Sequence, residues 1–219
     1  MPIRAILFDF DGVIIESVDM KTEAFKHIFK EQPENIIEKI VKLHLDNGGM
    51  SRFEKFKIIY KDILQKNLPA KEEKRLGKEF SKFCFERMLK LPYTKGAKEF
   101  LDAHYQDYIL FIVSGTPHEE INRIVNERQL RKYFKEVVGA PGSKGKHSKK
   151  ILKTYNIKPI EAVFVGDSPN DYEGASEANV RFIARIQPEK YNPFDSRIFK
   201  IEYKIEDLSH LENILHYIN

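Results

Sequence analysis

The sequence predicts an α/β fold, a doubly wound parallel sheet with a helical segment inserted after its first strand. Short, apolar, partly β-branched runs alternate with helical patterns near the start and throughout the second half of the chain, as in βαβ units. Between about residues 16 and 91, apolar residues instead recur at spacings of three and four, which is typical of amphipathic helices. The 219 residues suffice for one sizeable domain carrying a smaller insert.

Four apolar runs are expected to form strands of the sheet. They are Ile3–Phe8, Tyr108–Val113, Ala162–Val165 and Val180–Ala184. In parallel sheets, ligands bind beyond the carboxyl ends of the strands. Acids and hydroxyls follow three of these runs, at Asp9, Ser114 and Asp167, so this edge is the expected functional site. The tail from Asp195 onward has weaker strand-like and helical patterns, over Ile201–Ile205 and Leu208–Ile218.

The helical segment is broken by turn-forming residues at three places before the chain returns to the sheet at Leu91-Pro92. The breaks are Gln32-Pro33, Asp46-Asn47-Gly48-Gly49 and Asn67-Leu68-Pro69. We therefore predict a catalytic core of residues 1–15 and 92–219 and a helical cap of residues 16–91. Cys84, the single cysteine, excludes an intramolecular disulfide and is predicted to be a buried structural thiol.

Composition and charge favour a soluble cytoplasmic protein, either a monomer or a weak dimer. Charge comes too early for a signal peptide, and no apolar run is long enough to span a bilayer. The net charge is +4, and basic residues gather between Arg131 and Lys153. Such a run usually faces water, but it can also attract an anionic substrate or a nucleic-acid backbone. A nucleic-acid-binding protein with a structural Mg²⁺ site is therefore the alternative from a different class, although few aromatic residues interleave with the basic ones.

Asp9-Phe10-Asp11-Gly12-Val13 places two carboxylates directly after a buried strand, before a glycine at which the chain can turn. Paired carboxylates at one place bind Mg²⁺, because hard cations collect oxygen ligands. A carboxylate can also attack phosphorus as a nucleophile, while a second acid protonates the leaving oxygen.

Two further motifs end later strand-like runs. Ser114-Gly115-Thr116 precedes a helical pattern, where hydroxyls and backbone N–H groups suit phosphate oxygens, or where Thr116 simply caps a helix. The segment Gly166 to Asp171 contributes two acids four residues apart, Asp167 to complete a metal site and Asp171 to support it. Taken alone, that segment also fits a turn with an aspartate cap.

Taken in chain order, these motifs resemble those of the haloacid dehalogenase (HAD) superfamily of hydrolases, over the whole predicted core. The helical segment after the first motif looks like the cap of the branch that contains phosphoglycolate phosphatases and β-phosphoglucomutases. The resemblance implies that Asp9 is the nucleophile and a Mg²⁺ ligand and that Asp11 is the general acid and base, its backbone carbonyl also binding the metal. It further implies that Asp167 is a metal ligand supported by Asp171.

The same resemblance makes Ser114 and Gly115 a phosphate-binding pair and requires a lysine beside the nucleophile. Lys144 is preferred over Lys146, because it lies where the loop meets its following helix. The usual Lys-Pro-x-Pro form is absent.

Asp11 separates the chemistries of the family, because dehalogenases and phosphonatases lack an acid at that position. Its presence implies phosphoryl transfer from an oxygen ester of a small phosphorylated metabolite, with Mg²⁺ as cofactor. Hydrolysis by a phosphatase is the expected outcome, with a phosphomutase of the β-phosphoglucomutase type as the alternative.

Arg52 is the candidate for contact with the non-reacting part of the substrate. It follows the turn Asn47-Gly48-Gly49-Met50-Ser51, in which the two glycines permit close approach to a ligand. Ser51 is expected to cap the next helix and to leave Arg52 exposed in its first turn. An ordinary surface arginine is the alternative.

Overall fold

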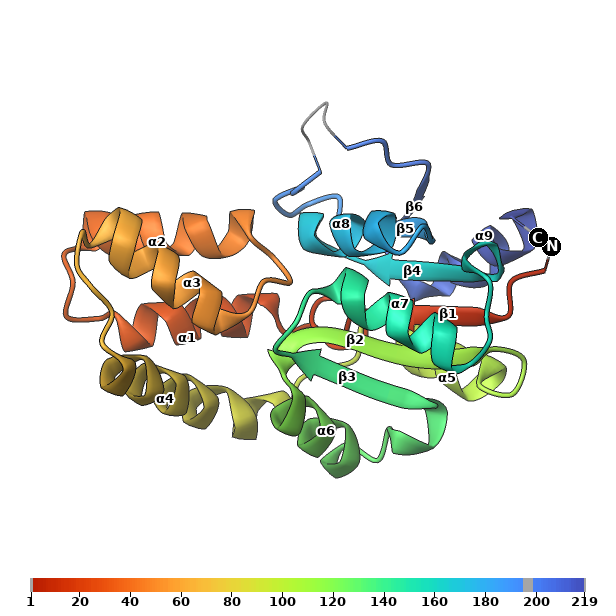
Figure 1. The fold of residues 1–219 in the computed structure, drawn as a ribbon, viewed down its shortest axis with the longest axis horizontal. Helices are drawn as coiled ribbons and strands as arrows, with labels where there is room; N and C mark the ends of the chain where they lie inside the picture. The colour runs from red at the N-terminus through yellow and green to blue at the C-terminus, as the bar shows by residue number, and fades with distance from the viewer. Residues whose placement is uncertain (1, 195–198, 219) are drawn as a thin grey trace.

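The computed structural model describes residues 2–194 and 199–218, which contain a six-stranded parallel sheet (Figure 1). The strands are β1 (Ala5–Phe8), β2 (Ile109–Pro117), β3 (Glu136–Ala140), β4 (Ala162–Gly166), β5 (Arg181–Arg185) and β6 (Tyr203–Ile205). Their order is β3-β2-β1-β4-β5-β6, and every neighbouring pair is parallel. The predicted α/β fold with a parallel sheet is confirmed.

Helices cover both faces of the sheet. They are α5 (Ala97–His104), α6 (His118–Glu127), α7 (Lys144–Thr154), α8 (Pro169–Glu177) and α9 (Leu211–Ile218). Short 3₁₀ turns occur at Arg131–Tyr133, Pro159–Glu161 and Leu208–His210. Side chains of a strand alternate between the faces, so Leu7 of β1 lies in the core formed with α7 and α8, whereas Phe8 lies in the core formed with α5, α6 and α9. Burial on both faces explains why this strand is a continuous apolar run.

Between β1 and β2 the chain forms a helical body beside the sheet (Figure 1). Its elements are α1 (Val18–Ile28), α2 (Glu34–Asp46), α3 (Arg52–Ile58), a π-helical turn (Ile59–Ile63) and α4 (Ala70–Met88). The breaks between them fall where turn-forming residues predict them. Phe25, Phe56 and Phe80 pack edge to face at its centre, with ring centroids 5.1 to 6.4 Å apart. Cys84 is buried in the same core, as predicted, and burial raises the pKa of its thiol to about 12.

Strand β3 is not among the four strands predicted from the sequence, because it lies in the basic run between Arg131 and Lys153. The β-branched pair Val137 and Val138 is too short a pattern to stand out beside the lysines around it. The basic side chains of this stretch are exposed except for Lys144. Strand β6 and helix α9 fall within the patterns predicted for the tail, while residues 195–198 at its start lie outside the described residues. Across the described ranges, no helix has the length and apolar character needed to cross a membrane.

Candidate active site

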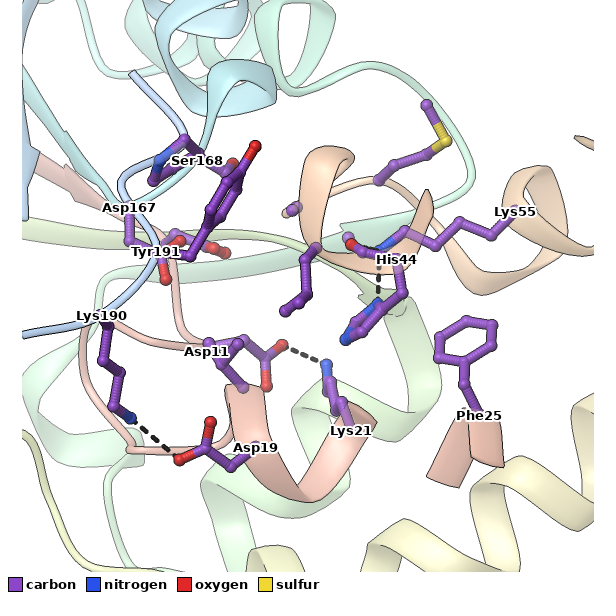
Figure 2. A pocket seen from close by; sticks show the side chains of 18 of the residues that line it. Asp11, Asp19, Lys21, Phe25, His44, Lys55, Asp167, Ser168, Lys190 and Tyr191 are labelled. Carbon is purple, nitrogen blue, oxygen red and sulfur yellow. Dashed lines mark hydrogen bonds and ion pairs between the residues drawn. The ribbon is translucent and has the colours of Figure 1, made fainter. Parts of the chain in front are cut away.

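A cavity of about 390 Å³ lies at the carboxyl ends of the central strands, between the sheet and the helical body. Figure 2 shows Asp11, Asp167 and Ser168 on one side of it and His44 and Lys55 on the other. The size suits a small metabolite. The motifs predicted from the sequence therefore converge on one concave site, which residues of the helical body complete.

Asp9 follows β1 directly and is fixed by the sheet, because its backbone N–H donates to the carbonyl of Val165 at 2.9 Å. Its side chain is only 2% exposed, and Oδ1 lies 2.9 Å from Nζ of Lys144. Burial raises the pKa of Asp9 to about 7, although the Lys144 ammonium opposes that rise. Lys144 Nζ is therefore the partner of Asp9 Oδ1, although the contact lacks the geometry of a full hydrogen bond. The carboxylate is therefore held in place without all of its lone pairs being used.

The Asp11 carboxylate is surrounded by donors that the sequence analysis did not assign to it. Ser17 Oγ donates to Oδ1 at 2.7 Å, Thr116 Oγ1 donates to Oδ2 at 3.0 Å, and Lys21 Nζ lies 2.5 Å from Oδ2. Burial acts to raise the pKa of Asp11, but Lys21 and the two hydroxyls outweigh it, and the pKa lies below its ordinary value. Ser17 and Lys21 stand four residues apart at a helix start, a spacing that places them on one face.

Lys144 lies beside Asp9 because α7 begins at this residue, after Ser143 caps the helix by accepting from the Lys146 N–H at 3.2 Å. The Lys144 side chain is 3% exposed, and Nζ lies 2.5 Å from Oδ1 of Asp171. Burial acts to lower the pKa of Lys144, but Asp171 and Asp9 together raise it above its ordinary value. Of the two lysines weighed from the sequence, Lys144 is at the site, and Lys146 is exposed.

Asp9, Asp167 and Asp171 bring carboxylate oxygens within 4.8 Å of one another, so the described residues offer the hard oxygen ligands that Mg²⁺ prefers. Both oxygens of Asp171 already have partners, Lys144 at Oδ1 and Ser168 at Oδ2. Burial, together with Asp9 and Asp171, raises the pKa of Asp167 well above its ordinary value. A divalent cation between Asp9 and Asp167 would relieve this repulsion, so the residues present fit a metal ion.

Gly12 lets Asp167 approach the loop after β1. Its φ of +75° belongs to the left-handed region, and a Cβ atom there would lie 1.9 Å from Oδ2 of Asp167. Arg185, at the end of β5, fixes the same loop by donating to the Gly12 carbonyl at 2.6 Å. A side chain in place of Gly12 would therefore displace Asp167 from the candidate metal site.

Ser114 and Gly115 lie at the end of β2, but they differ in their access to the cavity. Gly115 lines it, whereas Ser114 is buried and its Oγ accepts the N–H of Thr116 at 3.1 Å. A Cβ atom on Gly115 would lie 2.1 Å from the carbonyl oxygen of Gly49. The turn after α2 thus touches the end of β2, and Thr116 contacts Asp11 instead of capping a helix.

Arg52 corrects a sequence prediction, because it is buried and not exposed. The residue is 6% exposed, its Nη2 lies 2.6 Å from Oε2 of Glu120, and its Nη1 donates to Ser81 Oγ at 3.1 Å. The guanidinium also lies over the ring of Phe80, 4.8 Å from the centroid. Helices α4 and α6 supply these partners and so enclose the first turn of α3. Ser51 precedes this turn but makes no capping hydrogen bond with its side chain, contrary to expectation. Arg52 still lines the cavity.

Comparison with known proteins agrees with this geometry. A family model described as haloacid dehalogenase-like hydrolase matches residues 6–185. A phosphoglycolate phosphatase of Aliivibrio fischeri is 26% identical over 192 residues, which cover 83% of each chain. A phosphorylated carbohydrates phosphatase of Thermotoga maritima is 25% identical over 185 residues, 82% of this chain and 83% of the relative. The crystal structure of a predicted phosphoglycolate phosphatase from Haemophilus somnus shares the fold with a TM-score of 0.77, at 21% identity and 97% coverage of both chains.

Proposed function

The chain belongs to the haloacid dehalogenase-like hydrolases, as its motifs predict, and we propose that it is a Mg²⁺-dependent phosphatase of a small phosphorylated metabolite, working through an aspartyl-phosphate intermediate. The observation that carries the proposal is the pairing of two differently held carboxylates at one strand end. Asp9 is held through an ion pair with Lys144 at 2.9 Å, whereas Asp11 is fixed by Ser17, Thr116 and Lys21. One group is thus available for attack, and the other is oriented for proton transfer.

In the first step, an Asp9 oxygen attacks phosphorus in line, and the bond from phosphorus to the ester oxygen breaks. Asp11 takes up a proton from solvent once the phosphate is bound and gives that proton to the departing oxygen. The negative phosphate beside Asp11 raises the pKa of that carboxyl in the direction this step requires. In the second step, Asp11 takes a proton from water, which attacks the phosphoryl group on Asp9 and releases inorganic phosphate.

The groups around Asp9 stabilise negative charge on the phosphoryl oxygens. Lys144 lies 2.9 Å from Asp9 and is fixed by Asp171, so its charge is already placed when the substrate binds. At the end of β2, Gly115 lines the cavity and would contact phosphoryl oxygens, and Ser114, directly before it, would join it once its hydroxyl turns from the Thr116 N–H. Mg²⁺, held by Asp9, Asp167 and the backbone carbonyl of Asp11, would supply further charge neutralisation.

We further propose that residues 16–91 act as a cap on a core of residues 1–15 and 92–219. Their helices contribute Lys21, His44, Arg52 and Lys55 to the cavity wall, so they enclose the substrate and exclude water from it. The names of two relatives, a phosphoglycolate phosphatase and a phosphorylated carbohydrates phosphatase, support hydrolysis as the outcome.

The test is hydrolysis of para-nitrophenyl phosphate with Mg²⁺, comparing wild type with Asp9→Asn. The variant is expected to fold normally and to lose turnover, and wild type stopped by rapid quench should carry a hydroxylamine-labile phosphoryl group on Asp9. Asp19→Asn is the control, because Asp19 also lines the cavity and, among the described residues, its ion pair is with Lys190 at the exposed rim. Residual activity of Asp9→Asn above about 1% of wild type would remove the nucleophile assignment.

A further inference from the structure

We propose that Lys55 and His44 form a subsite for a second oxyanion, a carboxylate or a phosphate carried by the non-reacting end of the substrate. This inference rests on the proposed phosphatase function and assigns a chemical class to its substrate. Both residues line the cavity from the helical body, on α3 and α2, across from the acids at the strand ends (Figure 2).

Charge pairing in the cavity wall singles out Lys55. Each of the other cationic side chains lining the cavity in the described residues has a carboxylate partner. The pairs are Lys21–Asp11, Arg52–Glu120, Arg185–Glu16 and Lys190–Asp19. Across residues 2–194 and 199–218, Lys55 has no such ion pair, although it is only 3% exposed. A buried cation without a counter-ion is costly, and a bound anion would remove that cost.

Hydrogen bonds fix the roles of the two side chains. Nζ of Lys55 lies 2.8 Å from Nδ1 of His44 and 3.1 Å from the His44 carbonyl oxygen. When Lys55 is an ammonium group it only donates, so in that form Nδ1 accepts and the neutral ring carries its proton on Nε2. Burial, with the nearby Lys55 and Lys21 charges, lowers the pKa of His44 well below its ordinary value, which agrees with a neutral ring.

Lys55 keeps an unused donor, and the second donor of the pair, on His44, is only weakly held. His44 is 6% exposed, and its Nε2 makes no hydrogen bond of full geometry among the described residues, although a backbone interaction with Val18 acts to raise the pKa of the ring. The Lys55 ammonium has three N–H bonds, and residues 2–194 and 199–218 offer it two acceptors, both of them on His44. In Figure 2 the His44 ring lies between the Lys55 ammonium and the Asp11–Lys21 pair. The pair therefore offers donors and positive charge to the cavity.

The surroundings of Lys55 and His44 favour the binding of an oxyanion over a neutral or positively charged group. The His44 ring packs on the Phe25 ring with centroids 4.7 Å apart, and Lys55 Nζ lies 5.7 Å from the centroid of the Phe25 ring. Burial lowers the pKa of Lys55 to about 7, so an anion beside it would favour the charged form and bind more tightly in return. A hydroxyl gains less from these donors, and an ammonium group is repelled.

The test uses four phosphate esters of similar length that differ at the remote end. They are phosphoglycolate, ethylene glycol bisphosphate, 2-hydroxyethyl phosphate and 2-aminoethyl phosphate. We expect wild type to give a higher kcat/KM for the two anionic esters than for the hydroxyl ester, and the lowest for the amine. The better of the two anionic esters identifies the oxyanion as a carboxylate or a phosphate.

Lys55→Met keeps the length of the side chain and removes its charge. It is expected to lower kcat/KM for the anionic esters about 10- to 100-fold, while 2-hydroxyethyl phosphate changes less than about threefold. His44→Phe keeps the packing on Phe25 and removes the ring donor, so it should reduce the same preference. Lys57→Met is the matched control, because Lys57 lies on the same helix but is exposed. Equal effects of Lys55→Met on all four esters, or no effect on any, would overturn the subsite.

Binding to the Asp9→Asn variant separates this proposal from the phosphatase proposal. Calorimetry on Asp9→Asn, with and without Lys55→Met, measures the preference for phosphoglycolate over 2-hydroxyethyl phosphate without turnover. If no ester is hydrolysed by wild type but this preference depends on Lys55, the phosphatase proposal fails and the subsite stands. If the esters are hydrolysed and the preference does not depend on Lys55, the subsite fails and the phosphatase proposal stands.

Discussion

Glu120, on helix α6 beside the sheet, pairs with Arg52 of the helical body. Replacing Glu120 with glutamine tests how strongly this ion pair stabilises the fold. Glu120 Oε2 accepts hydrogen bonds from Arg52 Nη2 at 2.6 Å and from Ser81 Oγ at 2.7 Å. The Arg52 side chain is 5% exposed, so its charge depends on Glu120 and not on water. Glu120→Gln leaves that arginine buried without a counter-ion.

Removing one partner of a fully buried ion pair typically costs about 3 to 5 kcal/mol. Two features reduce that figure here. Glu120 is 16% exposed, and glutamine retains a carbonyl oxygen that can accept from Arg52. We therefore expect a loss of about 2 to 3 kcal/mol in the free energy of unfolding. For a chain of this size, each kcal/mol corresponds to roughly 2 to 4 °C, so the Tm should fall by roughly 4 to 12 °C.

Urea unfolding and calorimetry of Glu120→Gln would measure this loss, with Glu119→Gln as control because Glu119 is exposed on the same helix. The double variant Arg52→Met with Glu120→Gln should recover most of the stability, since no unpaired charge remains. If Glu120→Gln stays within about 0.5 kcal/mol of Glu119→Gln, the reasoning about the buried pair is refuted. A double variant less stable than the sum of its single changes would refute it as well.

Three other substitutions test the site. Asp11→Asn should slow alkyl phosphates about 10²- to 10⁴-fold while affecting para-nitrophenyl phosphate much less, because acid catalysis matters most for a basic leaving oxygen; equal kcat/KM losses on both would contradict an acid role. EDTA should abolish activity until Mg²⁺ is added, and Asp167→Ala should raise the Mg²⁺ concentration needed for half-maximal rate; an unchanged value would exclude Asp167 as a ligand. Gly115→Ala should raise KM at least about tenfold, because its new Cβ would lie 2.1 Å from the Gly49 carbonyl oxygen and displace the turn after α2. An unchanged KM would mean that this close contact is not needed for binding.

The fold could be predicted where a strand is buried on both faces. Strands β1 and β4 are continuous apolar runs for that reason, and the acids just beyond them stand out against this background. Strand β3 gives no such signal, because its few apolar residues are surrounded by lysines on the chain. Lys144 could be preferred over Lys146 because one residue begins the helix and the other lies within it.

The rest of the site depends on packing between segments far apart in the chain. The expectation of an exposed Arg52 used only its place in the first turn of a helix, and that local argument has no information about Glu120, which lies 68 residues away. The partners of Asp11 include Thr116, 105 residues along the chain. The contact between Lys55 and His44 joins two helices across a turn, and no spacing rule predicts that pairing.

The contacts between the helical body and the sheet domain differ in burial, and this difference bears on how a substrate reaches Asp9. Lys190 and Asp19 form an ion pair with side chains 46% and 80% exposed, in which water screens the attraction and the contribution to stability is small. Arg52 and Glu120 are buried, so separating them would leave two poorly hydrated charges. Separating Lys21 from Asp11 is expected to have an intermediate cost. A phosphate that arrives at Asp9 can replace Asp11 as the partner of Lys21, so the Lys21 charge does not remain unpaired. Opening the cavity is therefore expected to cost least on the side of Lys190, with the buried pair of Arg52 and Glu120 remaining in contact.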